Sequence, residues 1–292
     1  MAGCERCPRR CGADRRRGTG FCAAPEEMLV ARAAPHYGEE PCISGTRGSG
    51  TVFFAGCNLR CVFCQNHVIS RGGGGRPVTV QGLRDILLRL RDQGVHNINL
   101  VTPTHYSEPI AEALAGLELG IPVVWNSSGY ESVEQLRALE GLVQIYMPDF
   151  KYADAALAGR LSAAPDYPAV ALAAIREMYR QTGPFQLDDG GLLRTGVLIR
   201  HLILPGHAEN TLGVMDAIED HLEPGGLLFS LMSQYTPMPG LEAYPELQSP
   251  VSPEEYRRCL SYLDFSSIEH GYCQSPESAT EEMIPDFDGT GV

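Results

Sequence analysis

From Thr51 onward, short apolar or β-branched runs alternate with longer segments in which apolar residues recur with helical period. This alternation is typical of βα units that build a parallel sheet. We predict strands at residues 51–56, 97–101, 121–126, 143–147, 196–204 and 227–231. We predict helices near residues 81–93, 107–118, 131–139, 168–182, 208–221 and 253–263. Six units are fewer than the eight of a closed TIM barrel, so the expected fold is α/β, an open, partial (βα)6 barrel.

The two ends of the chain lack this pattern. Residues 1–48 show no regular period and are rich in cysteine and arginine, whereas residues 265–292 are polar and acidic. We therefore predict a Cys-rich metal-binding module at 1–48, the partial barrel at 49–264 and a C-terminal tail at 265–292. The tract Gly72–Gly75 predicts a loop or lid, because consecutive glycines do not support a helix or strand.

The composition is that of one large domain with a core and a small appendage: 292 residues, of which 43% are hydrophobic. No apolar run approaches the roughly eighteen residues of a membrane span, and the start has no apolar signal-peptide core. We expect a cytoplasmic protein without a membrane partner. In that compartment, ten cysteines are more often metal ligands or catalytic groups than disulfides.

The charge is uneven along the chain. A formal net charge of −13 argues against binding of nucleic acid or membrane by the whole surface, since phosphates would be repelled. The first 20 residues reverse this sign. We call their basic residues the arginine island: Arg6, Arg9, Arg10, Arg15, Arg16 and Arg17. The island is either a solvated loop or a local binding site.

The strongest chemical signal is a C-x3-C-x2-C set, Cys57, Cys61 and Cys64, directly after the first predicted strand. Three thiolates on one tight loop can hold three irons of a cubane and leave the fourth iron without a protein ligand. An open metal position is typical of a catalytic site rather than a structural one. The alternative is a zinc knuckle with His67 as the fourth ligand.

A second set, Cys4, Cys7, Cys11 and Cys22, has the spacing C-x2-C-x3-C-x10-C. Four thiolates close a coordination sphere, so structural zinc and a second, fully ligated iron–sulfur cluster are equally reasonable. The remaining cysteines are isolated, and we expect them to be buried as small apolar residues: Cys42, Cys259 and Cys273.

The three-cysteine loop, with Phe63 before its last cysteine and Gln65 and Asn66 after it, resembles the radical S-adenosylmethionine (SAM) superfamily and its pyruvate formate-lyase activating enzyme branch. Other matching segments are residues 39–41, 44–50, 99–105, 149–152, 200–206 and 232–235. Together they resemble the PflX group of activase homologues. The resemblance implies a [4Fe–4S] cluster that reductively cleaves SAM, and a 5′-deoxyadenosyl radical that abstracts hydrogen.

The resemblance also implies where SAM binds, because ligands of parallel α/β folds lie at the carboxyl ends of strands. The implied cofactor contacts are Phe63, Asn66, Thr102, Thr104, Asn126, Ser127, Met147, Asp149, Arg200 and Gln234, with a monovalent cation at the end of the fourth strand. The implied catalytic residues are His105, Lys151 and His201. The activases bind the methionine amino group with a Gly-Gly-Glu-Pro-like turn. Here Thr102–His105 replaces it, and we expect Thr104 to provide the contact.

By analogy with the activases, the favoured function is hydrogen abstraction from a glycine of a protein partner. Within the enzymes, the alternative is modification of a peptide, an RNA or a small metabolite. In another class, the alternative is a non-catalytic iron–sulfur or zinc protein. Reductive cleavage requires an electron donor such as flavodoxin or ferredoxin, and the arginine island is the candidate docking site for an acidic donor.

Overall fold

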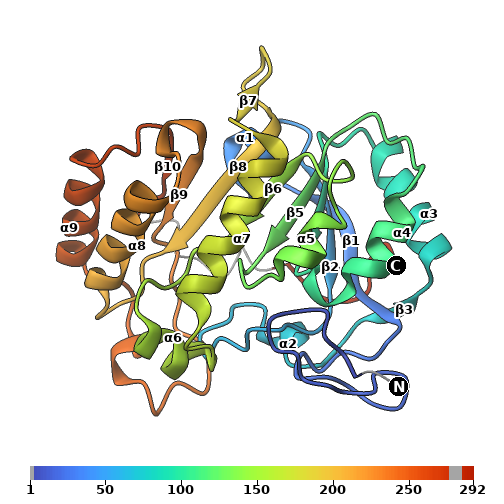
Figure 1. Cartoon of the computed structure of the whole chain (residues 1–292), viewed down its shortest axis with the longest axis horizontal. Helices are drawn as coiled ribbons and strands as arrows, with labels where there is room; N and C mark the ends of the chain where they lie inside the picture. The colour runs from blue at the N-terminus through green and yellow to red at the C-terminus, as the bar shows by residue number, and fades with distance from the viewer. Residues whose placement is uncertain (1–2, 276–284) are drawn as a thin grey trace.

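The computed structural model describes residues 3–275 and 285–292. Its centre is a parallel sheet in which neighbours in sequence are neighbours in space (Figure 1). In spatial order its parallel strands are β2 (Ser49–Phe54), β4 (Ile98–Val101), β5 (Val123–Ser127), β6 (Ile145–Pro148), β8 (Leu193–Leu202), β9 (Leu228–Met232) and β10 (Gly271–Cys273).

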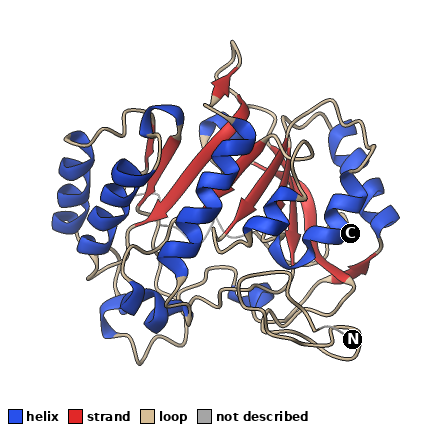
Figure 2. Ribbon diagram, in the orientation of Figure 1, coloured by secondary structure: helices blue, strands red, loops and turns tan. Residues whose placement is uncertain are grey.

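Helices connect these strands and cover the sheet (Figure 2). They are α3 (Val80–Asp92), α4 (Ser107–Leu114), α5 (Val133–Arg137), α6 (Ala155–Ser162), α7 (Tyr167–Thr182), α8 (Ala208–His221) and α9 (Pro253–Asp264). Helix α3 shows why they form. The Thr79 side chain caps its first turn by accepting from Gly82 N, and its buried residues recur at helical spacing (Leu83, Ile86, Leu87, Leu90). Strands β4, β5 and β6 are buried throughout, as expected for parallel strands covered on both faces.

The predicted fold class is confirmed. Each of the six predicted strands and six predicted helices has a counterpart, with bounds that differ by a few residues. Among the described residues, the sheet runs from β10 at one edge to β3 at the other, and these two edges do not pair. The barrel is therefore open, as expected from fewer than eight units.

Several elements were not predicted. Strand β1 (Met28–His36) lies antiparallel to β2, β3 (Arg76–Val78) is antiparallel to β1, and β7 (Gln186–Leu187) pairs with β8. Helix α6 and strand β10 were not predicted either. The other additions are short: α1 (Pro41–Ser44), α2 (His67–Ser70), and the 3-10 turns η1 (Thr104–Tyr106), η2 (Pro224–Gly226) and η3 (Pro245–Gln248). Strand β1 reads as irregular in sequence because both of its edges are paired and its burial does not alternate.

Both ends of the chain contact the sheet. Residues 3–27 contain no helix or strand and pack beside the loop that follows β2. Within the predicted tail, β10 extends the sheet at one edge. Residues 285–292 lie against β1 and β2: Ala33 N of β1 donates to Thr290 O at 2.9 Å, and the Phe287 ring contacts that of Phe53 in β2. None of the helices in the described ranges is long and apolar enough to span a membrane.

Candidate active site

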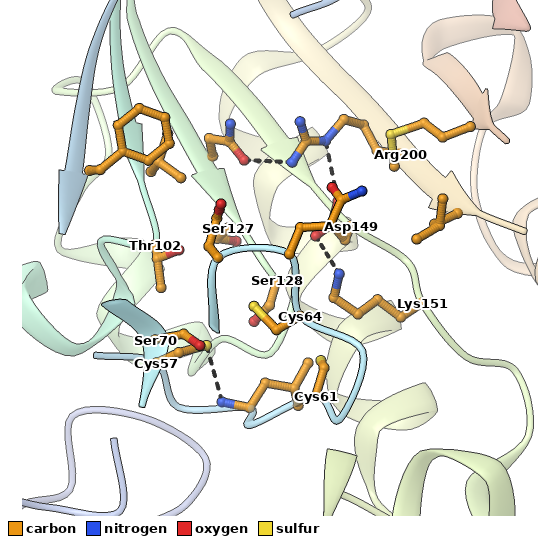
Figure 3. Close-up of a pocket in the computed structure, with 18 of the residues that line it drawn as sticks. Cys57, Cys61, Cys64, Ser70, Thr102, Ser127, Ser128, Asp149, Lys151 and Arg200 are labelled. Carbon is orange, nitrogen blue, oxygen red and sulfur yellow. Dashed lines mark hydrogen bonds and ion pairs between the residues drawn. The ribbon is translucent and has the colours of Figure 1, made fainter. Parts of the chain in front are cut away.

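The three-cysteine loop leaves the carboxyl end of β2 through a tight turn. Gly56 has φ 87°, and a Cβ at this position would lie 2.7 Å from the carbonyl oxygen of Cys22. Only glycine therefore allows residues 3–27 to approach this closely. Arg60 also has a positive φ, 59°, and the loop is anchored by the fully buried side chain of Leu59. This backbone directs the thiols of the loop toward one pocket (Figure 3).

The pocket has a volume of about 230 Å³ and lies between this loop and the strand ends. It brings together most of the residues predicted from the sequence. Those that line it are Cys57, Cys61, Cys64, Phe63, Asn66, Thr102, Asn126, Ser127, Asp149, Lys151, Arg200 and Gln234. Residues from five separate strand ends thus meet at one site, as the parallel topology requires.

The donor set fits a cubane cluster. Cys57 Sγ accepts from Leu59 N at 3.4 Å, and Cys61 Sγ accepts from Ser162 Oγ at 3.0 Å. Within the described residues, no three His, Cys, Asp or Glu side chains are placed to hold a single metal ion. A cubane cluster does not require the three sulfurs to converge on one metal ion, because each cysteine binds a different iron.

Burial raises the pKa of the Cys57 thiol to about 12 and also raises that of Cys61. As free thiols these groups therefore keep their protons at neutral pH. Thiolate ligands must be deprotonated, so a bound metal centre has to supply the positive charge that displaces the protons. Cys57 and Cys61 are consequently suited to a cationic cofactor and poorly suited to act as free nucleophiles.

A layer of paired charges crosses the pocket, with Arg200 of β8 at its centre (Figure 3). The guanidinium donates to Glu39 Oε2 at 3.1 Å, to Asp149 Oδ1 at 3.2 Å and to Asn126 Oδ1 at 2.7 Å. Lys151 Nζ donates to the other oxygen of Asp149 at 2.7 Å. Two acids and two bases therefore neutralise one another inside the barrel.

These pairs set the charge states of the layer. Burial acts to raise the pKa of Asp149, but Lys151 and Arg200 outweigh it and hold that pKa below its usual range. Burial acts to lower the pKa of Lys151, and Asp149 more than offsets this, so the pKa is raised. Lys151 thus stays an ammonium at neutral pH and can bind an anion but not accept a proton.

The predicted monovalent cation does not fit this geometry. Both oxygens of Asp149 already face cationic groups, Arg200 and Lys151, which leave no net negative charge for another cation. The Met147 side chain is fully buried in a separate apolar cluster with Ile145 and Leu198. Met147 is therefore not brought to the pocket, and we no longer assign it a cofactor contact.

Thr104 and His105 do not reach the pocket either. The short turn η1 rotates both side chains beneath it: Thr104 Oγ1 donates to the buried Glu131 at 2.6 Å, and His105 Nε2 lies 2.8 Å from Ala55 O. Burial lowers the pKa of His105 to about 3. Thr104 thus supports the turn, and His105 is a neutral packing residue rather than a catalytic one. The turn presents Thr102 to the pocket, in a left-handed conformation with φ 57°.

His201 faces away from the pocket because side chains alternate along a strand. Arg200 points inward, so its neighbour His201 points toward α8, where its ring nitrogens lie 2.6 Å from Phe150 O and 2.9 Å from Thr211 Oγ1. Burial lowers its pKa to about 4. His201 is a structural link between β8 and its neighbours, and the catalytic role predicted for it is withdrawn.

The sequence predicted no role for Glu39 and Ser128, which line the pocket, or for Glu131, which lies beneath it. Glu39, which follows β1, accepts from Arg200 and from Asn99 Nδ2 at 2.9 Å. Ser128 lines the pocket, and its buried hydroxyl has no hydrogen-bond partner among the described residues. Glu131 is fully buried, which raises its pKa. The signal in the sequence was for Glu39, which lies in the segment 39–41 that resembles the family.

The second cysteine set lies outside the pocket. Cys7 and Cys22 are buried, Cys4 is half-buried and Cys11 is exposed. Of the three isolated cysteines, Cys42 and Cys259 are buried as expected, whereas Cys273 is exposed. Residues 3–27 contact the three-cysteine loop directly, with Cys57 N donating to Cys22 O at 3.0 Å.

The arginine island is not a uniform surface. Arg15 is buried and donates to the carbonyl oxygens of Ala24, Pro25 and His105. Arg6 pairs with Glu26 and Glu108. Arg9 is engaged with the three-cysteine loop. This corrects the expectation that the island acts as a whole. Its exposed members are Arg10, Arg16 and Arg17.

Comparisons with known proteins agree with this geometry. The family model described as Radical SAM superfamily matches residues 51–182, from β2 to the end of α7. The uncharacterized protein MJ0674 of Methanocaldococcus jannaschii is 31% identical over 271 residues, which cover 89% of this chain and 74% of that protein.

Two solved structures of SuiB from Streptococcus suis are similar in fold. SuiB bound to precursor peptide SuiA has a TM-score of 0.52 at 15% identity, covering 78% of this chain and 49% of SuiB. SuiB alone has a TM-score of 0.50 at 14% identity, covering 75% and 47%. The chain spans about half the length of SuiB. At this identity, the likeness shows the fold alone.

Proposed function

This chain belongs to the radical SAM superfamily, and from that premise we propose that it binds a [4Fe–4S] cluster through Cys57, Cys61 and Cys64 and uses it to cleave SAM. The observation that carries the proposal is that the three thiols share one pocket with the polar strand ends. When bound, the cluster would supply the electron that breaks the sulfur–C5′ bond of SAM, giving methionine and a 5′-deoxyadenosyl radical.

The residues of the pocket have separate tasks in this proposal. Thr102, Ser127 and Ser128 offer oxygen atoms that accept hydrogen bonds from the amino group of SAM. Ser128 is the preferred contact, because an unpartnered buried hydroxyl costs free energy unless a ligand satisfies it. Lys151 offers a permanent cation to the SAM carboxylate, and Asp149 orients it at 2.7 Å.

The apolar part of the site excludes water. Phe63 and Leu59 are buried beside the cysteines, and Leu202 and Met232 line the strand side of the pocket. Water exclusion strengthens the interactions of Lys151 and Arg200 with anionic groups. It also protects a reactive radical from side reactions with solvent.

For the substrate, we propose hydrogen abstraction from a protein partner, as in the activases that the sequence resembles. The charges of the pocket are paired, with Glu39 and Asp149 neutralised by Arg200 and Lys151. Arg60 also lines the pocket, so the lining offers phosphates an excess of only one cation, and the chain carries a net charge of −13. Both features favour a peptide segment with few charges, such as a glycine-containing loop, over an RNA.

The test is anaerobic reconstitution with iron and sulfide, followed by reduction in the presence of SAM. We expect 5′-deoxyadenosine and methionine in equal amounts from the unaltered chain, and none from Cys61→Ala. Cys273→Ser is the matched control, because this exposed thiol lies outside the pocket. Undiminished SAM cleavage by Cys61→Ala would disprove the assignment of the cluster ligands.

The electron would come from an acidic donor such as flavodoxin or ferredoxin. Residues 3–27 cover the outer side of the three-cysteine loop, and Arg10, Arg16 and Arg17 are exposed on this segment. Arg10 and Arg17 form only exposed surface pairs, 3.9 Å from Glu134 and 3.6 Å from Asp14. We propose these three arginines as the docking site, since they are exposed cations on an acidic protein.

A further inference from the structure

Residues 3–27 pack against the barrel without regular secondary structure or a large apolar core. They contain no helix or strand, and their buried apolar residues are Cys7, Cys22 and Ala24. Fixing one backbone residue costs about 1–2 kcal/mol of conformational entropy. So small an apolar core cannot offset that cost over the whole segment, and short segments of this kind are stabilised by a disulfide or a metal. The cysteines of this segment are free thiols.

The cysteine side chains of the segment gather in one place. Cys4 N donates to Ala13 O at 3.0 Å and Gly12 N donates to Cys4 O at 3.1 Å, which brings Cys4 beside Cys11. A Cβ on Gly20 would lie 3.3 Å from the sulfur of Cys11 and 3.5 Å from that of Cys22. The sulfurs of Cys11 and Cys22 therefore both lie close to Gly20, in space that the side chain of any other residue at position 20 would occupy.

The remaining contacts complete a set of four. The Cys4 thiol lies close to that of Cys11, and Cys7 lies near Cys4 and Cys22. Cys7 and Cys22 are buried, Cys4 is half-buried and Cys11 is exposed, so the four thiols extend from the interior of the segment to its surface.

We propose that Cys4, Cys7, Cys11 and Cys22 hold a second metal centre, closed by four thiolates, whose task is to fix Arg9 on the three-cysteine loop. Zinc and an iron–sulfur cluster share this ligand chemistry. No three such side chains within the described ranges already surround one point. A single ion therefore requires the thiols to rotate inward, whereas a cluster accepts the wider spacing. Four protein ligands leave no open position, so the centre is structural.

Arg9 is the link between the two cysteine sets. It lies in the turn between Cys7 and Cys11, and its guanidinium donates to Asn58 O at 2.8 Å, Leu59 O at 3.3 Å and Ser162 O at 2.9 Å, and also to Ala163 O. The side chain packs against the rings of Phe21 and Tyr130. One side chain thus ties the three-cysteine loop to the end of α6. Loss of the metal would free the turn that carries it.

The metal is tested in a way that does not depend on the proposed function. In the full chain with Cys57, Cys61 and Cys64 all changed to Ala, zinc, iron and sulfide are measured per chain after anaerobic purification. We expect about one zinc, or about four irons with sulfide, and these two results identify the centre. Adding Cys7→Ser or Cys22→Ser should remove this metal, whereas adding Cys273→Ser should not. A triple variant without bound zinc or iron would overturn the proposal.

If the triple variant is insoluble, the unaltered chain and Cys7→Ser are compared instead, and equal contents of zinc and of iron would overturn the proposal. The role of Arg9 is tested separately and rests on the proposed function. In Arg9→Met, a chelator should strip the reconstituted cluster about tenfold faster, because charge-assisted hydrogen bonds to the loop are lost. The second centre should remain loaded, Arg9→Lys should restore part of the effect, and Arg257→Met, at an exposed arginine of α9, should have none. Equal stripping rates in Arg9→Met and Arg257→Met would refute the link.

Discussion

Replacing Arg200 by methionine should destabilise the barrel severely. The guanidinium contacts two carboxylates and one amide, and the exposed fractions of the side chains of Arg200, Glu39 and Asp149 are 16%, 9% and 14%. Methionine approximates the volume of the removed side chain, so the main effect is electrostatic. Asp149 keeps Lys151, but Glu39 loses its cation and keeps only the amides of Asn99 and Asn126.

The magnitude follows from this imbalance. Removing one partner of a buried ion pair costs about 3–5 kcal/mol, because the other charge is left without compensation. We expect a loss near the lower end, about 3 kcal/mol, since the two amides still donate to Glu39. The double variant Arg200→Met/Glu39→Gln should recover about 1–2 kcal/mol of it, because the stranded charge is gone.

Equilibrium urea unfolding of the single variants and the double variant, followed by circular dichroism, gives the cycle. Glu39→Gln alone should cost less than Arg200→Met, because Arg200 retains Asp149. A loss below about 1 kcal/mol in Arg200→Met, or no recovery in the double variant, would refute the assignment of Arg200 as the centre of this layer.

Three further predictions concern single contacts. Thr104→Val should cost about 1–3 kcal/mol of stability by depriving Glu131 of a donor and should leave the affinity for SAM unchanged, whereas Ser128→Ala should weaken SAM binding. Anaerobic titration with SAM measures both affinities, and weaker binding by Thr104→Val with unchanged binding by Ser128→Ala would contradict the site as described. Burial lowers the pKa of His201 to about 4, below the value near 6.5 of the unfolded chain, so stability should fall by up to about 3 kcal/mol from pH 6.5 to 4. His201→Gln should flatten this pH dependence of stability in urea unfolding, and an unchanged pH dependence would contradict a buried neutral imidazole. Changing Arg10, Arg16 and Arg17 together to Glu should slow flavodoxin-driven SAM cleavage but not dithionite-driven cleavage, and the effect should fade with salt because the Debye length is about 8 Å at physiological ionic strength; equal rates with flavodoxin would exclude this docking site.

The sequence predicted the fold well because the apolar period of each βα unit is local information. The three-cysteine loop and the polar strand ends could be found for the same reason, since each follows its own strand. The alternation of side chains along a strand is also local information. Because side chains alternate, Arg200 and His201 cannot both face the pocket, and the arginine is the residue that does.

Other features depend on contacts between distant segments and leave little local trace. The turn η1 rotates Thr104 toward Glu131. This rotation could not be predicted from the sequence, which shows only a short polar stretch after a strand. Arg15 looks like any surface arginine in sequence, yet three carbonyl oxygens from three different residues surround its guanidinium. Strand β1 is paired by β2, β3 and the residues near 290, and its pattern is intelligible only once these partners are known.

The strand order has a consequence for how the molecule assembles. From β2 to β10 each strand pairs with the next parallel strand along the chain, so the sheet can grow one unit at a time with short loop closures. The contacts of residues 3–27 are different, because Arg9 reaches Ser162 and Arg15 reaches His105. These contacts can form only after α6 and the turn before α4 are in place. Complete docking of the N-terminal segment therefore requires these parts of the barrel, and until it docks the outer side of the three-cysteine loop is uncovered.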